Sequence, residues 1–464
     1  MIAQIYRSVS TIRPYLSLQS FDVSTAEGRS RERQRRAFLS TIVALVAKVV
    51  SIGTQLITVP VTLSYLGTER FGLWMTMSSV IAMLAFADLG IGNGLLNAIA
   101  KANGEDDTVA MRRYISSAVV ILCLVSLVVL VTFEFSYPYI PWANFFNIHS
   151  SLAIAEAGPA VKLFVFCFAL NIPATIVQRA QLGLQMGFVA NLWQALGSVF
   201  ALVAVLVAVY MRCGLQWLVL AFAGAPVIAS AMNGIVFFGK TRRDLSPSLS
   251  FATSDSAFRI IKLGLLFFVL QIVVSVTYLS DNIVIARVLG ASVVTIYALP
   301  DKMFSVIPMI LTMMLTPLWP AYGEAIARRD GKWVGRILKK TLLISLLTSM
   351  VLSTTFFCLG DELLSLWAGH HIATPIALLL GMALWKIIEA VGNTVAVYLN
   401  GHGLIREQVL MSVMTGFSAI CGKFYLVQNW GVAGAIWATI MAYLGFSAVP
   451  LYYLVKKTFR VQSA

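Results

Sequence analysis

The chain has 464 residues, of which 59% are apolar and only 12% carry a formal charge, half of the ~25% found in soluble domains. Together with a mean hydropathy of +0.84, this composition excludes a soluble globular enzyme, a disordered chain and a fibrous protein, and it indicates a polytopic membrane protein. The formal net charge of +14 would suggest nucleic-acid binding in a soluble protein. The placement of the basic residues therefore has to decide between a nucleic-acid-binding protein and a membrane protein.

The first 37 residues are polar and end in an arginine-rich run. We expect a basic cytoplasmic tail, much of it disordered, because so little apolar surface cannot offset the entropy of folding. From Phe38 onward the apolar runs are long enough to cross a bilayer, which takes ~20 helical residues. Helices are expected because backbone polar groups in lipid must be paired within their own segment. The predicted spans are 38–66, 71–100, 113–135, 159–179, 188–211, 216–238, 260–285, 291–318, 341–360, 373–400, 408–428 and 432–455.

These twelve spans form two sets of six. The longest internal polar segment, 239–259, is rich in serine and divides them. The sequence therefore predicts an all-α polytopic membrane protein with an N-terminal six-helix bundle, a cytoplasmic linker, a C-terminal six-helix bundle and a short cytoplasmic tail, at 38–238, 239–259, 260–455 and 456–464. An even number of spans in each half means that both halves enter the membrane from the same side, so a repeat axis would run along the membrane normal.

The basic residues are distributed asymmetrically around the predicted spans. With the N-terminus inside, 25 of the 34 fall in cytoplasmic segments, whereas the external loops contain only Arg70, Arg212 and Arg287. The remaining six are lysines within spans. The positive-inside rule therefore predicts that both termini are cytoplasmic. The asymmetry also explains the basic composition, so we expect no nucleic-acid partner.

The cysteines and histidines form no recognisable site. The five cysteines lie apart in or beside apolar runs, and the histidines His149, His370, His371 and His402 form no metal-ligand or triad pattern. The sequence also contains no GxxxxGK[ST] phosphate-binding loop. We therefore expect no metal and no cofactor.

We single out ten ionisable residues within the predicted spans, where each costs ~2.5–3.5 kcal/mol if it faces lipid. Lys162 and Lys262 begin their spans and are expected to reach the interface. Five lie 10–16 residues into their spans, ~15–24 Å deep: Lys48, Asp301, Lys302, Lys386 and Glu389. The other three are Asp88, Asp281 and Lys423.

Several of these residues belong to polar stripes at helical spacing. Thr41, Ala44, Lys48, Ser51 and Gln55 share one face of the first span; Lys386, Glu389, Asn393, Ala396 and Asn400 share one face of the tenth; Gln271, Ser275, Tyr278 and Asn282 do so in the seventh. Two interpretations stay open: a hydrated central cavity between the two halves, or polar contacts between packed helices. Lys386 and Glu389 are three residues apart and can also neutralise one another.

The sign of the deep charges favours an anionic substrate. Lysines outnumber carboxylates near the midplane, and a compact ammonium group suits phosphate. The candidate substrate-binding residues are Lys48, Lys302, Lys386, Lys423, Gln55, Gln271 and Asn393. Asp88, Asp281, Asp301 and Glu389 are candidates for coupling to a proton or cation gradient, or for neutralising the lysines.

Glycines and prolines predict departures from straight helices. The glycine-rich run from Asp88 to Gly94 allows close helix packing or a bend; with no strand before it, it is not a nucleotide loop. Pro300 and Pro308 should break or kink the eighth span beside Asp301 and Lys302. A broken helix at this depth is common where transporters bind and hinge, and a static kink is the alternative.

Four stretches resemble the signature of polysaccharide-biosynthesis membrane proteins. They are Leu66-Gly67 through Trp74, Phe86 through Asn93, Ser280 through Ile285 with Leu289-Gly290 and Ile296 through Leu299, and Leu399 through Gly403. These proteins are the lipid flippases for O-antigen and exopolysaccharide, in the superfamily that also contains the multidrug and toxic-compound exporters (MATE). The resemblance extends over 38–455.

The resemblance implies a MATE-like fold, with two bundles around a V-shaped cavity that opens alternately to each side. The implied cargo is an undecaprenyl-pyrophosphate-linked oligosaccharide, moved from the inner to the outer leaflet of the bacterial inner membrane. The lysines would attract its pyrophosphate. A polysaccharide polymerase, a chain-length regulator and membrane lipid are the implied partners. Two alternatives stay open: a multidrug exporter of the same fold, and a polytopic glycosyltransferase or glycan ligase that uses the external loops 136–158 and 361–372.

Overall fold

The computed structural model describes residues 21, 25–83, 88–142, 150–289, 293–368 and 374–463, and the regular structure within these ranges is helical. The chain forms two compact units, Met1–Leu265 and Leu266–Ala464. Eleven helices in the described ranges are long and apolar enough to cross a membrane, so the prediction of an all-α polytopic protein is confirmed. The predicted span 71–100 is not among them, because residues 84–87 lie outside the described ranges.

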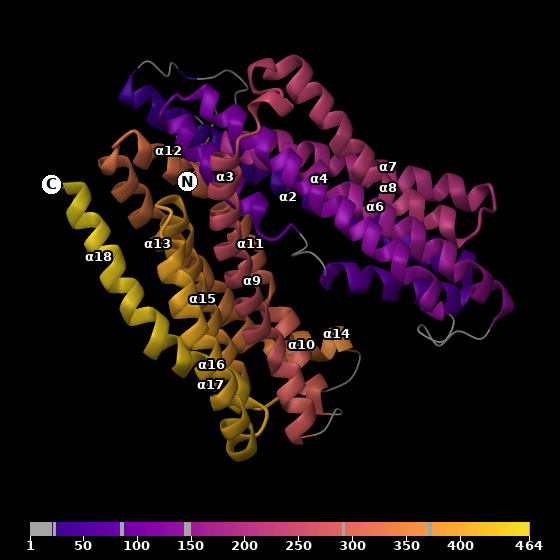
Figure 1. Ribbon diagram of the computed structural model, residues 1–464. Coiled ribbons are helices and arrows are strands. Elements are labelled where there is room, and N and C mark those ends of the chain that lie inside the picture. The colour runs from indigo at the N-terminus through magenta and orange to yellow at the C-terminus, as the bar shows by residue number, and fades with distance from the viewer. Residues whose placement is uncertain are drawn as a thin grey trace, which may run out of the picture. The chain divides into compact units, whose positions relative to one another are not determined.

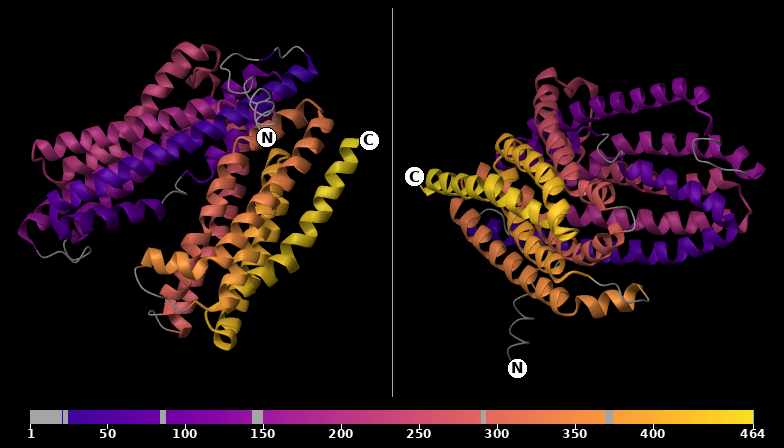
Figure 2. Two further views of the ribbon diagram at one scale, coloured as in Figure 1. Left: turned by 180° about the vertical axis from the view of Figure 1, so that it is seen from behind. Right: turned by 90° about the horizontal axis from the view of Figure 1, so that it is seen from below.

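The first unit consists of long helices that run beside one another (Figure 1). Helix α7 packs against α2 and α8, and α6 packs against α4 and α8. The grouping of α6, α7 and α8 is visible in both further views (Figure 2). The helices are α2 (Ala26–Met83), α3 (Ile91–Gly104), α4 (Thr108–Ser136), α6 (Ser151–Gly183), α7 (Gly187–Tyr210) and α8 (Leu215–Val236).

The end of the basic tail is helical, which corrects part of the expected disorder. Helix α2 begins at Ala26, and its carboxylate Glu32 accepts hydrogen bonds from Arg35 and Arg36, each at 2.7 Å. These pairs at three- and four-residue spacing reduce the repulsion between arginines and support the helix. Residues 1–20 and 22–24 of the predicted tail lie outside the described residues. Gly67, with φ of 73°, kinks α2 where the turn between the first two spans was predicted.

The glycine-rich run does allow both a bend and close packing, as predicted. Gly90 adopts φ of 72° before α3, a conformation that favours glycine. A Cβ atom on Gly94 would lie 2.8 Å from the carbonyl oxygen of Ile260 and 3.1 Å from the nitrogen of Gly264. Gly94 on α3 and Gly264 near the start of α9 (Ser254–Leu289) therefore form a crossing where two backbones touch.

The linker of the first unit is packed against α4. It contains a π-helical turn, η3 (Phe237–Thr241), and two short 3₁₀ turns, η4 (Arg243–Leu245) and η5 (Leu249–Phe251). Arg112 on α4 donates to the carbonyl of Ser246 at 2.8 Å and lies 4.0 Å above the ring of Phe251. Arg242 donates to Asp244 at 2.7 Å, and this hydrogen bond holds the pKa of the Asp244 carboxyl below its usual value.

The second unit contains most of α9 and the helices that follow it. Its predicted eighth span is broken beside Asp301 and Lys302, as expected, into α10 (Val294–Phe304), α11 (Val306–Leu315) and α12 (Leu318–Ala327). Pro300 and Pro308 contribute because neither can donate a backbone hydrogen bond. The remaining elements are α13 (Gly331–Cys358), α14 (Gly360–Ala368), α15 (Ile376–Gly401), α16 (Ile405–Trp430), α17 (Ala433–Tyr443), the π-helical η7 (Leu444–Ala448) and α18 (Val449–Ser463).

Alanine substitution at Gly94, with a control glycine elsewhere, tests the crossing of α3 and α9. We expect Gly94→Ala to lower the free energy of unfolding by about 1–3 kcal/mol, because the new methyl group meets backbone atoms that cannot move independently. The matched control is Gly53→Ala on α2, where a Cβ would meet nothing within 4 Å and helix propensity improves. Thermal unfolding in detergent measures both. If Gly94→Ala unfolds at the same temperature as Gly53→Ala, the two backbones do not touch.

Candidate functional site

Lys386, in the second unit, is the centre of an ion-pair network. This lysine is on α15 and its side chain is 9% exposed. Its ammonium lies 3.0 Å from the carboxylate of Glu389 on the same helix and 3.9 Å from that of Asp301 on α10. Asp301 is half-exposed and Glu389 is 18% exposed. One ammonium therefore faces two carboxylates that belong to different helices.

Lys423 and Asp281 form a second, fully enclosed pair. Lys423 on α16 has no exposed side-chain surface, and its ammonium lies 2.6 Å from Asp281 on α9. The same ammonium donates to the carbonyl of Thr277 and to the hydroxyl of Ser280, so two of its three donors have acceptors and the carboxylate supplies the counter-charge. Tyr297 on α10 donates to the other oxygen of Asp281 at 2.7 Å. This pair joins three helices, and its charges are already compensated.

A cavity of about 430 Å³ adjoins Glu389 of the Lys386 network. Glu389 and Asn393 from α15 line it, together with Trp385, Gln408 and Tyr443. Gln408 donates to Asn400 at 3.0 Å. Glu389 thus contacts both the lysine and the cavity, and a proton or small cation in the cavity would compete with Lys386 for this carboxylate.

The other predicted substrate-binding residues lie outside the two ion pairs. Lys48 and Gln55 are exposed on α2, and Lys302 is exposed on α10. Within the described residues neither lysine has an ion-pair partner. Gln271 on α9 is half-buried. The structure therefore separates the predicted lysines into two paired and buried groups, Lys386 and Lys423, and two exposed groups, Lys48 and Lys302.

Asp88 lies in the first unit and orders the start of α3. Its two carboxylate oxygens accept from the backbone amides of Gly90 at 2.9 Å and Gly92 at 3.3 Å, which pairs amides that the helix itself leaves free. Arg179 on α6 lies beside this turn and donates to Asn93 at 2.9 Å. The predicted span ended at 179, whereas α6 continues to Gly183, so Arg179 lies within the helix.

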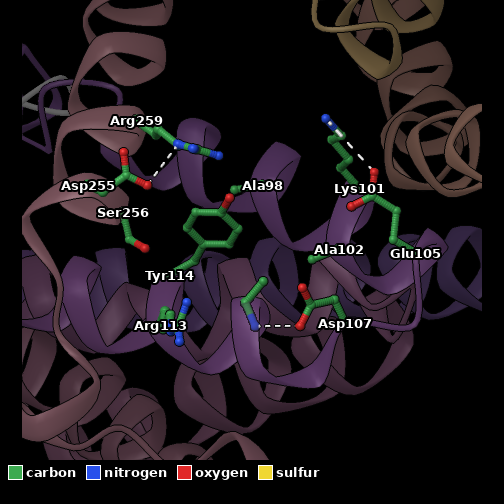
Figure 3. Close-up of a pocket in the computed structure, with 11 residues that line it drawn as sticks. Ala98, Lys101, Ala102, Glu105, Asp107, Arg113, Tyr114, Asp255, Ser256 and Arg259 are labelled. Atoms are coloured by element: carbon green, nitrogen blue, oxygen red, sulfur yellow. Dashed lines mark hydrogen bonds and ion pairs between the residues drawn. The ribbon is translucent and has the colours of Figure 1, made fainter.

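A further pocket of the first unit, about 290 Å³ in volume, lies between α3, α4 and the start of α9 (Figure 3). Tyr114 on α4 extends toward Ala98 on α3. The charged residues that line this pocket are balanced in sign: three are basic, Lys101, Arg113 and Arg259, and three are acidic, Glu105, Asp107 and Asp255. Arg259 pairs with Asp255 at 3.1 Å and Lys101 with Glu105 at 3.9 Å. These pairs favour no particular charge in a ligand.

The comparison with protein families decides the assignment. The family model described as polysaccharide biosynthesis protein matches residues 39–326. The chain belongs to this family. Among curated proteins it is 22% identical over 410 residues to a putative O-antigen export protein of Yersinia pseudotuberculosis, covering 86% of this chain and 91% of that protein. It is also 22% identical to a putative O-antigen transporter of Salmonella typhi, covering 88% of this chain and 94% of that protein.

Solved structures show the fold of this family member. A MATE transporter in a bent conformation superposes with a TM-score of 0.77 at 14% identity, covering 93% of this chain and 96% of that chain. A transporter of the MOP superfamily from Pyrococcus furiosus superposes with a TM-score of 0.75 at 12% identity, covering 93% and 97%. The predicted MATE-like fold class is therefore confirmed, and identities this low show the fold alone.

Two substitutions test whether Lys423 and Asp281 stabilise the fold by compensating each other's charge. We expect Lys423→Met to lower the free energy of unfolding by about 3–5 kcal/mol, because it leaves the carboxylate of Asp281 buried without its counter-charge. Adding Asp281→Asn removes that charge and keeps an acceptor for Tyr297, so the double variant should regain most of the loss. Melting temperature in detergent checks this. A double variant as unstable as the single one would refute charge compensation as the reason.

Proposed function

We propose that this chain is a flippase that moves undecaprenyl-pyrophosphate-linked oligosaccharide across the bacterial inner membrane for O-antigen or exopolysaccharide synthesis. The observation that carries the proposal is the family membership, together with O-antigen transporters that align over most of their own length. Eleven membrane-spanning candidates in the described ranges support a transporter. We place both termini in the cytoplasm, following the asymmetry of the basic residues.

The unpaired lysines suit the diphosphate of such a substrate. Lys48 and Lys302 are exposed, and within the described part of the chain their ammonium groups have no carboxylate to satisfy them. An ammonium group that must avoid lipid favours water or an anion, and phosphate oxygens accept charge-assisted hydrogen bonds from lysine. Gln55 and Gln271 would add neutral donors. Lys423 is left out of these candidate residues because its charge is already compensated by Asp281.

Lys386 and its two carboxylates form the proposed coupling group. Protonation of Glu389 would release the ammonium toward Asp301, and protonation of Asp301 would leave it on Glu389. The two contacts belong to different helices, α15 and α10, so a proton would change which helices are joined. An ion gradient can drive transport only if its ion binds the two conformations differently. Asp88 is assigned to ordering α3, and Asp281 to neutralising Lys423.

A multidrug exporter of the same fold is less well supported. Organic cations require carboxylates that are free to meet them. In this structure Asp281, Asp301 and Glu389 each lie within 4 Å of a lysine. The likeness to MATE structures is at 14% identity or so and concerns the fold. A glycan ligase or glycosyltransferase remains the alternative that the following experiment separates directly.

Deleting the gene tests the function. We expect the lipid-linked glycan to accumulate on the cytoplasmic leaflet, because nothing carries its polar head across the hydrocarbon core. Leaflet position is measured by access of a membrane-impermeant glycan-modifying enzyme to spheroplasts and to inverted vesicles, with the complemented strain as control. A glycan that reaches the outer leaflet but is not joined onward would identify an enzyme and contradict transport.

Lysine substitutions test the proposed site. We expect Lys48→Ala and Lys302→Ala to lower surface polysaccharide about tenfold with protein level unchanged, since both lysines are exposed and one charge-assisted contact contributes about 1.5–3 kcal/mol. The matched control is Lys262→Ala, which removes an exposed lysine near the start of a span. Immunoblots of polysaccharide and of tagged protein provide the readout. Normal polysaccharide in both variants would remove these lysines from the mechanism.

A further inference from the structure

A second polar cavity lies wholly within the first unit, among helices that cross the membrane. It has a volume of about 260 Å³ and is formed by α6, α7 and α8. No charged residue lines it. Its polar lining consists of amides and hydroxyls, namely Asn171, Thr175, Gln178, Gln194, Ser198, Ser230 and Asn233, and Trp193 supplies an aromatic surface. We call it the neutral groove.

Some polar groups of the neutral groove are satisfied by the protein. Asn233 exchanges two hydrogen bonds with Gln181, at 2.7 and 3.0 Å. Thr175 and Ser198 donate to carbonyls of their own helices at 2.8 and 3.2 Å. These contacts join α6 to α8 and are what polar groups between packed helices normally do.

The remaining polar side chains of the neutral groove have no hydrogen-bond partner within the described part of the chain. The side chains of Asn171, Gln178, Gln194 and Ser230 make no hydrogen bond to any of the residues that the structure describes. Gln194 is exposed and the other three are partly buried. Each amide offers two donors and two lone pairs of an acceptor, and any that faced hydrocarbon unpaired would cost several kcal/mol. They therefore require water or a ligand, and the absence of charge in the lining excludes an ionic ligand as the natural occupant.

We propose that the neutral groove binds a sugar unit of the transported glycan; the inference rests on the proposed flippase function and names the part of the substrate that the first unit recognises. Neighbouring sugar hydroxyls both donate and accept, which matches primary amides. The less polar face of a sugar ring suits Trp193, whose ring is apolar with one polar edge. The volume is below the 300–1,000 Å³ of pockets for drug-sized ligands, so it suits one sugar unit rather than the whole oligosaccharide.

The second unit supports this assignment by contrast. Its 430 Å³ cavity is lined by α15, α16 and the α17–α18 segment, the fourth, fifth and sixth spans of that half, together with residues of α9 and α11. The neutral groove is formed by the fourth, fifth and sixth spans of the first half. The two cavities thus share a position in the two sets of spans. Only the second contains a carboxylate, Glu389, so of these two cavities only the one in the second half presents a charged group.

Binding of two lipids to purified protein tests the inference. The probes are the undecaprenyl-pyrophosphate-linked oligosaccharide that the deletion strain accumulates and undecaprenyl pyrophosphate without sugar, both radiolabelled, in detergent. We expect Trp193→Ala to weaken binding of the glycan-linked lipid about tenfold, the size expected for truncating an aromatic contact residue. Binding of the sugar-free lipid should stay within about twofold of wild type. Gln178→Ala should act in the same direction with a smaller loss.

The controls remove the same residue types elsewhere. Trp217→Ala and Gln428→Ala change exposed side chains outside the groove and should leave both affinities unchanged. The melting temperature shows whether each variant is folded. If Trp193→Ala does not fold, Gln178→Ala still tests the inference. Wild-type affinity of both groove variants for the glycan-linked lipid overturns the inference and leaves the flippase proposal standing. Equal weakening toward both lipids, or loss of a co-purifying phospholipid by mass spectrometry, overturns it too, since the groove would then hold lipid. Wild-type protein that binds neither probe overturns the flippase proposal and the inference with it.

Discussion

A charge inside a membrane has to be paired or hydrated, and this constraint orders the residues of both units. In the second unit Lys423 is enclosed by Asp281 and neighbouring oxygens, and Lys386 lies between Glu389 and Asp301. The charges that are compensated in this way hold helices together. Lys48 remains exposed on α2 and is the single charged residue between positions 38 and 66. Its position is best explained by an aqueous or anionic neighbour, which suits the diphosphate of the proposed substrate.

The neutral groove of the first unit and the 430 Å³ cavity of the second unit differ in chemistry. Both involve the last three spans of their half, yet one has a neutral lining and the other includes Glu389 beside a lysine. A carboxylate paired with an ammonium responds to protons, whereas a lining of amides does not titrate. Recognition by the first half would therefore be insensitive to the ion gradient that acts on the second. With this division, the cargo and the driving ion would bind at different places and could differ in chemistry.

Sequence reasoning predicted the helices well because hydrocarbon thickness and backbone pairing leave few choices. It also placed the break beside Pro308 and the close packing at Gly94, since proline and glycine act locally. It could not assign partners: Lys423 and Asp281 are far apart in the chain and meet only through packing of α9 against α16. The helix that contains Arg179 extends four residues beyond the predicted end of its span at 179. The neutral groove did leave a signal, with Asn171, Thr175 and Gln178 at positions i, i+4 and i+7.

The broken span between α10 and α11 has an electrical consequence. Pro308 cannot donate to the carbonyl of Phe304, and Pro300 cannot donate to that of Ile296, so two oxygen dipoles lack their helical donors close to Asp301 and Lys302. Solvent drawn to these dipoles would raise the local polarisability around the lysine and the aspartate. Less of the membrane voltage would then fall at this level, and more of it would fall across the drier, unbroken parts of the span, where the field would be correspondingly steeper.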